Sequence, residues 1–174
     1  AGEGNAFISA GVETVSRFPK GTSDGWPDSH NALFADAEQR TLEAAAGAEE
    51  WHDPRADGVL PDVYIAMGQT AENVALFTGI SREDQDHWGV RSQNRAEEAI
   101  NSGFFDREIV PVTLPDGTTV SKDDGPRAGT TYEKISQLKP VFRPNGTVTA
   151  GNACPLNDGA AAVVIMSDTK AREL

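Results

Sequence analysis

Gly159-Ala-Ala-Ala-Val-Val-Ile-Met166 is an almost unbroken apolar run near the end of the chain, and it fixes the class of fold. A run of this kind, without polar alternation, is typical of a strand that is buried on both faces of a sheet. Ser167 or Asp168 can then act as a helix N-cap, and we expect a helix to begin at 169. A buried strand followed by a helix is the pattern of an α/β protein.

A second short apolar run, Asn5-Ala-Phe-Ile-Ser-Ala-Gly11, lies near the other end and also predicts a strand. Strands that are buried on both faces need neighbouring strands and covering helices. The 174 residues do not contain enough such elements. We therefore expect the chain to be a piece of a larger α/β protein, beginning just before one strand and ending inside a helix.

The segment between the two runs has the pattern of an insertion with elements of its own. Helices are expected over 36–46, 67–77, 81–102 and 130–138, with glycine stops after the first three and capping-box patterns opening the last two. A β-hairpin is expected over 108–121, with its turn at 115–117. The irregular part of 17–60 carries aromatic residues that we interpret as structural anchors, namely Trp26, Phe34 and Trp51.

The helix over 81–102 has small and apolar residues at the spacing of one face. We expect that face to be the packed one, and it consists of Trp88, Ser92, Ala96, Ala99 and Ile100.

The composition is that of an acidic globular protein. Apolar residues make up 38% of the chain, and 27 acidic against 15 basic residues give a formal net charge of −12. This balance disfavours nucleic acid and an anionic membrane as partners, because both attract basic surfaces. Cys154 is the only cysteine, which excludes an intramolecular disulfide and favours a reducing, cytoplasmic setting. The three histidines lack metal-binding spacing, so we expect no metal site.

Short motifs along nearly the whole chain, apart from about 17–60, resemble those of the thiolase family in the same order. They are Ser9-Ala-Gly-Val-Glu-Thr-Val-Ser16, Met67-Gly-Gln-Thr-Ala-Glu-Asn-Val74, Ile80-Ser-Arg-Glu-Asp-Gln-Asp86, Arg91-Ser-Gln-Asn-Arg-Ala96, Phe104-Phe-Asp-Arg-Glu-Ile-Val-Pro111, Asp124-Gly-Pro-Arg-Ala-Gly-Thr-Thr131, Leu138-Lys-Pro-Val-Phe142, Gly146-Thr-Val-Thr-Ala-Gly-Asn-Ala153 and Leu156-Asn-Asp-Gly-Ala-Ala-Ala162.

The resemblance implies part of a layered α-β-α-β-α fold, in which a loop domain is inserted into the first of two related halves. Residues 1–16 would be a strand and turn of that half, 17–150 the inserted α+β loop domain, and 151–174 the last strand with the start of its helix. The two core strands that flank the loop domain would then be neighbours in one sheet.

The resemblance also implies an acetyl-CoA acetyltransferase or 3-ketoacyl-CoA thiolase of fatty-acid metabolism, which forms or cleaves 3-ketoacyl-CoA in a Claisen-type reaction. That chemistry needs one thiolate to carry the acyl group, a second thiol to move the α-proton and a histidine to activate the nucleophile. A chain with one cysteine does not hold this set. We assign no catalytic residue here and expect the chain alone to be inactive, with coenzyme A and acetyl-CoA or acyl-CoA as substrates of the whole protein and no bound cofactor.

By motif position, the resemblance places four residues of this sequence against coenzyme A. Met67 and Phe142 would line the pantetheine tunnel, Arg127 would meet the adenine nucleotide, and Cys154 would stand where many thiolases bond the pantetheine amide through a serine. Core packing remains the alternative for Met67 and Phe142, and a solvated loop cation the alternative for Arg127. Ala66 and Pro155 depart from the residues common in the family, which leaves the acyl-chain preference open.

The resemblance further implies a homodimer or homotetramer, with the strand pair over 108–121 as the candidate contact. A non-catalytic thiolase-like lipid or sterol carrier is the alternative function, and a self-standing acidic interaction domain is a third. Cys154 as a nucleophile has little local support, because no histidine is near it in sequence. The Asn157-Asp158-Gly159 segment is interpreted as a turn that shapes the backbone rather than as a catalytic group.

Overall fold

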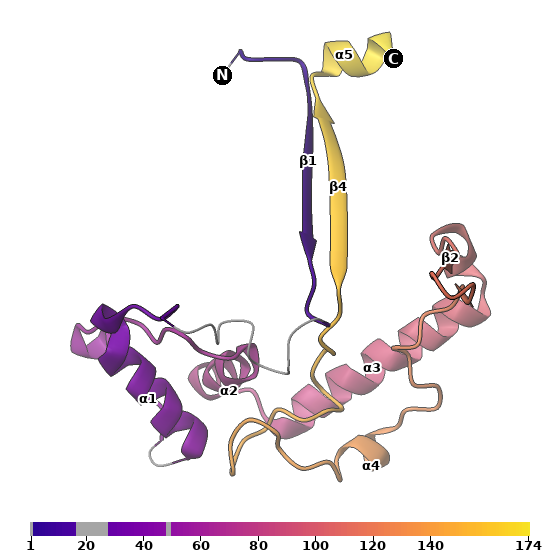
Figure 1. The fold of residues 1–174 in the computed structure, drawn as a ribbon. Coiled ribbons are helices and arrows are strands. Elements are labelled where there is room, and N and C mark those ends of the chain that lie inside the picture. The colour runs from indigo at the N-terminus through magenta and orange to yellow at the C-terminus, as the bar shows by residue number, and fades with distance from the viewer. Residues whose placement is uncertain (1, 17–27, 48–49) are drawn as a thin grey trace. The chain divides into compact units, whose positions relative to one another are not determined.

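The computed structural model describes residues 2–16, 28–47 and 50–174 (Figure 1). The chain divides into two compact units. The first comprises Ala1–Ser29 with Leu156–Leu174, and the second comprises His30–Pro155.

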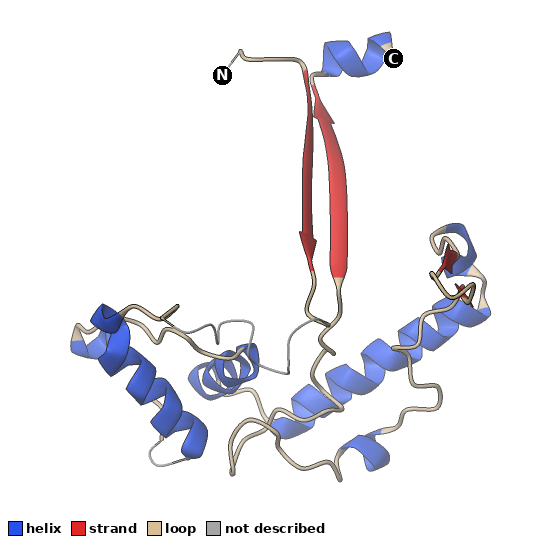
Figure 2. Cartoon of the chain, viewed as in Figure 1, coloured by secondary structure: helices blue, strands red, loops and turns tan. Residues whose placement is uncertain are grey.

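The first unit is a two-stranded antiparallel ladder followed by a helix. Strand β1 (Ala6–Glu13) pairs with β4 (Gly159–Met166) over their whole length, in the register Ala6 opposite Met166 (Figure 2). Both predicted strands, and their predicted pairing, are thereby confirmed. Helix α5 (Asp168–Glu173) follows with Ser167 as its N-cap, and the Ser167 side chain accepts from the Lys170 N–H.

The side chains of this ladder are exposed on both faces. Ile8, for example, is 76% exposed. Apolar strands of this kind are stable in sheets whose faces are covered. The described residues of this unit supply no such cover.

The turn before β4 closes the ladder in a way that the sequence did not predict. The Asp158 carboxylate accepts from the backbone N–H and the hydroxyl of Ser16, at 2.8 and 2.6 Å. Asp158 thus ties the two strand ends together, which agrees with a structural role.

The second unit contains the remaining helices. Helix α1 spans Ala35–Ala46, α2 spans Met67–Thr78 and α3 spans Arg82–Asn101. Gly47 and Gly79 end the first two in the left-handed conformation, where a side chain would be strained, as their position predicted. Short 3-10 turns occupy Ala32–Phe34, Pro54–Asp57 and Phe104–Arg107.

The predicted capping boxes have different outcomes. Ser81 caps α3, and its hydroxyl accepts from the Asp84 N–H at 3.0 Å. Helix α4 (Tyr132–Ile135) has Thr131 as its N-cap, and the Thr131 side chain makes no cap bond. The prediction at Thr130 is therefore wrong, because its hydroxyl donates to the Arg127 carbonyl instead.

The predicted hairpin is present but short. Strand β2 (Val112–Thr113) pairs antiparallel with β3 (Thr119–Val120), and Gly117 in the turn has a φ of 86°. Asp116 accepts from the Thr118 N–H at 2.9 Å, which holds the turn.

The packed face of α3 agrees with the predicted stripe only in part. Ala96 and Ala99 are half-buried, but Trp88 is 67% exposed, and Ser92 and Ile100 are exposed as well. The face turned inward in this unit centres on Asp86, which is buried, and on Gly89 and Gln93. The prediction followed apolarity, whereas polar contacts to neighbouring segments orient this helix.

The aromatic residues of the irregular segment act as anchors where the structure describes them. Trp51 donates its indole N–H to Asp62 at 2.8 Å, and Phe34 contacts Tyr64 edge-on. Trp26 lies outside the described residues. None of the helices in the described ranges combines the length and apolarity that a membrane crossing requires.

Candidate functional site

Two of the four residues predicted to contact coenzyme A lie together at the start of α2. Met67 is the first residue of the helix and is 77% exposed. The ring of Phe142 lies on the next residue, Gly68, where an added Cβ would fall 2.2 Å from ring atoms. A glycine is required there because the ring occupies the place of a side chain. Phe142 therefore packs on the first turn of α2, against the residue that follows Met67.

Polar contacts fix the segment that carries Phe142 along α2. The Phe142 carbonyl accepts from the amide of Gln69. The guanidinium of Arg143 donates to Gln69 Oε1 at 2.6 Å and to Asn73 Oδ1. Burial lowers the pKa of Arg143, while Glu72 and Asp62 oppose that shift. These contacts hold the Phe142 backbone in place.

Glu72, buried on the same helix, binds the segment that follows. Its carboxylate accepts from the backbone N–H groups of Thr147 and Val148, each at 2.8 Å, and from the Thr147 hydroxyl at 3.0 Å. Gly146 allows this approach, since an added Cβ there would lie 2.2 Å from Glu72 Oε1. A buried carboxylate that accepts several N–H donors is stable without a cation in contact.

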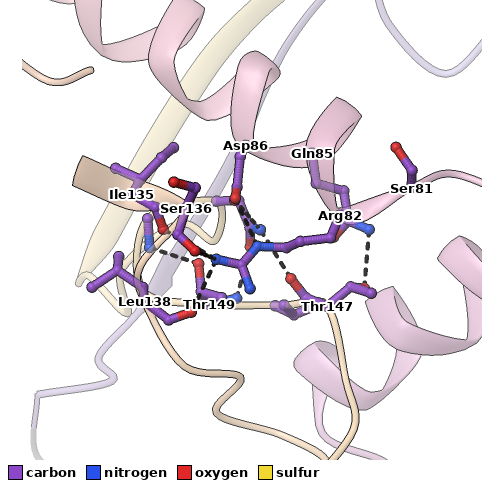
Figure 3. A network of polar contacts seen from close by, with 12 residues as sticks. Ser81, Arg82, Gln85, Asp86, Ile135, Ser136, Leu138, Thr147 and Thr149 are labelled. Carbon is purple, nitrogen blue, oxygen red and sulfur yellow. Dashed lines mark hydrogen bonds and ion pairs between the residues drawn. The ribbon is translucent and has the colours of Figure 1, made fainter. Parts of the chain in front are cut away.

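A second polar network holds the chain just before Cys154 (Figure 3). The Asp86 carboxylate on α3 is 1% exposed and pairs with Arg82 Nε at 2.7 Å. The same guanidinium donates to the carbonyls of Ile135 and Leu138, both at 3.0 Å. The other oxygen of Asp86 accepts from the side-chain amide of Asn152 at 2.9 Å.

Asn152 closes a tight turn over 149–153. Its Oδ1 accepts from the Thr149 N–H at 2.8 Å, and its Nδ2 also donates to the Thr147 carbonyl at 3.0 Å. The backbone N–H of Ala153 donates to the Thr149 carbonyl at 3.1 Å. Cys154 follows this turn directly and is exposed with a free thiol.

Glycines let this turn approach α3 closely. A Cβ on Gly89 would lie 2.6 Å from the carbonyl oxygen of Gly151, and a Cβ on Gly151 would lie 2.9 Å from Ile135 Cβ. The turn therefore fits between α3 and α4 only with glycine at both positions.

The histidines are engaged away from Cys154. His30 stacks on Tyr64 and contacts Glu38, His52 contacts Asp57, and His87 stacks on Tyr132. Cys154 is not a partner in any of these contacts.

Arg127 lies in the loop between the hairpin and α4. Its backbone N–H donates to Gln93 on α3 at 2.8 Å, and its exposed guanidinium donates to the Asp124 and Gly125 carbonyls. The loop is thus fixed to α3, with the cation at the surface. Its described contacts do not include Met67, Phe142 or Cys154.

The second unit also contains a groove that the sequence did not indicate. It has a volume of about 560 Å³, and its walls come from α1, α2, the stretch beside Trp51 and the segment 143–147. None of the four predicted coenzyme A residues lines it. Within the described residues, no three side chains of His, Cys, Asp or Glu form a group that could hold a metal ion.

The residues that order this region were not singled out from the sequence. Glu72, Asp86 and Asn152 lie within the quoted motifs, but each makes its contacts far along the chain. For Glu72 and Asp86, the sequence did offer a signal, which is a charged residue on the inner face of a helix. Such a residue is buried only when it has a partner, so it indicates a contact with another segment.

Comparison with known proteins identifies the family of these motifs. A family model described as "Thiolase, N-terminal domain" matches residues 1–169. A probable acetyl-CoA acyltransferase of Staphylococcus aureus is 39% identical over 99% of this chain. A beta-ketoadipyl-CoA thiolase of Acinetobacter baylyi is 41% identical over 97% of it. The chain spans 42% and 41% of the length of these relatives.

Solved structures give the same result for the fold. The dimeric peroxisomal thiolase of Saccharomyces cerevisiae matches 97% of this chain with a TM-score of 0.72 and 32% identity, and the match covers 38% of that chain. Human mitochondrial 3-ketoacyl-CoA thiolase in complex with CoA matches 97% with a TM-score of 0.59 and 30% identity, over 39% of that chain. These matches confirm the predicted partial thiolase-like α/β fold.

Proposed function

Because this chain belongs to the thiolase family, we propose that the whole protein is an acyltransferase that forms or cleaves the carbon–carbon bond of 3-ketoacyl-CoA. The match over residues 1–169 carries this proposal. Its substrates would be coenzyme A with acetyl-CoA or a longer acyl-CoA. The proposal includes a cytoplasmic location and no resident cofactor.

Within that protein, this chain would supply contacts to coenzyme A. The exposed Met67 offers a flexible thioether, and the ring of Phe142 on the neighbouring Gly68 offers an aromatic surface, and both suit the pantetheine chain. Arg127 keeps its guanidinium at the surface of a fixed loop, where it can stack on a base or meet a phosphate. Cys154 would lie beside the pantetheine amide, with a thiol that bonds it only weakly.

The proposed chemistry requires groups that this chain does not hold. One thiolate must accept the acyl group and a second thiol must move the α-proton, whereas the sequence has a single cysteine. We therefore expect no thiolysis by the 174-residue chain alone.

The β2–β3 hairpin is our proposed contact between subunits. Val112, Leu114 and Val120 are exposed there, and a short edge pair with apolar side chains is suited to pairing with a second copy. This contact would make the whole protein a homodimer or homotetramer.

Calorimetric titration of the chain with coenzyme A tests the binding role. Met67→Ala should weaken binding of coenzyme A but leave binding of its isolated nucleotide portion unchanged. Arg127→Ala should weaken both, by about tenfold, because a charged contact is lost. Arg95→Ala, which removes another exposed arginine, is the matched control. A folded wild-type chain that binds neither ligand at millimolar concentration would refute the proposed role.

A further inference from the structure

We propose that Asp86 is a positioning residue for coenzyme A binding, acting through Asn152 on the turn that carries Cys154. This inference rests on the function proposed above. Asp86 touches no ligand in this scheme. It orients the amide of Asn152, and that amide sets the geometry of the turn over 149–153.

The Asp86 carboxylate is held from both sides. Arg82 pairs with one oxygen at 2.7 Å, and the carbonyls of Ile135 and Leu138 fix the same guanidinium. The carboxylate is 1% exposed, so water does not compete for it. An ionised carboxylate can only accept hydrogen bonds, so the group that faces its second oxygen must be a donor. That group is the side-chain amide of Asn152.

That requirement determines which way the Asn152 amide points. Its Nδ2 must face Asp86, at 2.9 Å, so its Oδ1 must face the backbone N–H of Thr149, at 2.8 Å. The same Nδ2 donates to the Thr147 carbonyl at 3.0 Å. One side chain therefore binds both arms of the turn, and the charge on Asp86 selects that arrangement.

The turn has little freedom to take another position. Gly151 lies against Gly89 on one side and against Ile135 on the other, with no room for a Cβ on either glycine. Cys154 follows two residues after Asn152. Its backbone direction is therefore set by the turn, and a ligand contact at Cys154 needs this fixed geometry.

The single thiol of the chain provides a direct probe. An aromatic disulfide reagent modifies Cys154 alone, since the sequence has no other cysteine, and the released aromatic thiolate measures the rate. Desulfo-CoA serves as the protecting ligand because it lacks a thiol that would compete. The wild-type chain should react, and saturating desulfo-CoA should slow that reaction.

Asp86→Asn places an amide N–H against either Arg82 or Asn152. We expect the unliganded rate at Cys154 to change by about threefold or more, and protection by desulfo-CoA to be lost. Glu98→Gln, at an exposed carboxylate on the same helix, is the control and should behave as wild type. Circular dichroism verifies that each variant is folded.

A second substitution tests the direction of the Asn152 amide. Asn152→Asp keeps an acceptor for the Thr149 N–H, but it sets a carboxylate oxygen against Asp86 and against the Thr147 carbonyl, so protection should be lost. Wild-type protection in Asp86→Asn or in Asn152→Asp would overturn the proposal.

If Asp86→Asn does not fold, protection of Cys154 is measured in Asn152→Ala, because this variant leaves the Arg82–Asp86 pair intact. Retained protection in that folded variant overturns the inference, and lost protection supports the step from Asn152 to Cys154 on which it depends. A wild-type chain that desulfo-CoA does not protect would refute coenzyme A binding at Cys154. An unliganded rate that Asp86→Asn and Asn152→Ala leave unchanged would refute the positioning role by itself.

Discussion

Replacing Gly89 by alanine tests whether the close approach between α3 and the turn over 149–153 governs stability. In the interior of an exposed helix, this substitution ordinarily stabilises a protein by about 1 kcal/mol, because alanine loses less backbone freedom. At Gly89 the new Cβ would lie 2.6 Å from the carbonyl oxygen of Gly151. Ordinary carbon–oxygen contacts begin at about 3.3 Å, so the turn must move by about 0.7 Å.

The cost of that movement exceeds the gain in helix propensity. Overpacking costs about 1–3 kcal/mol, and a strained hydrogen bond to the buried Asp86 carboxylate costs about 1.5–3 kcal/mol. The Asn152 bond to Asp86, at 2.9 Å, is the one that the movement strains. We expect Gly89→Ala to lower the free energy of unfolding by about 2 kcal/mol.

Urea unfolding followed by far-UV circular dichroism measures this change, since the helices of the second unit supply the signal. Asn94→Ala is the control, because it raises propensity at an exposed position of the same helix and should stabilise slightly. If Gly89→Ala unfolds at the same or a higher urea concentration than wild type, the packing argument is wrong.

Further substitutions test other contacts. Glu72→Gln turns an amide N–H toward backbone donors and should cost about 2 kcal/mol in urea unfolding; an unchanged midpoint would contradict the buried network. Ser81→Ala should lower stability by about 1 kcal/mol and Thr131→Ala by much less, because only Ser81 makes a cap bond; equal losses would contradict this. The hydrogen bond from Arg55 lowers the pKa of Asp53, so its stabilising effect exists at neutral pH and is lost as the pH falls through that lowered pKa. Arg55→Gln should raise this pKa in an NMR titration, and no shift would refute the pairing.

The limits of the longer helices and strands were predictable because they depend on neighbouring residues, whereas α4 is shorter than the expected 130–138. Gly47 and Gly79 stop helices by adopting positive φ, and the apolar run at 159–166 forms a strand. These preferences act within a few residues, so the sequence alone is enough to predict where an element begins and ends. The motif series likewise identified the family without any coordinates.

The way in which those elements pack against one another could not be predicted from such local preferences. The apolar stripe at Trp88 was expected to face inward, but contacts between residues far apart in sequence orient α3. Asp86 and Asn152 are 66 residues apart, and neither periodicity nor propensity links them. Gly68 and Gly89 look like weak points in helices until Phe142 and Gly151 are seen to fill the space beside them. A side chain's role depends on what occupies its surroundings, and those surroundings exist only once the chain has folded.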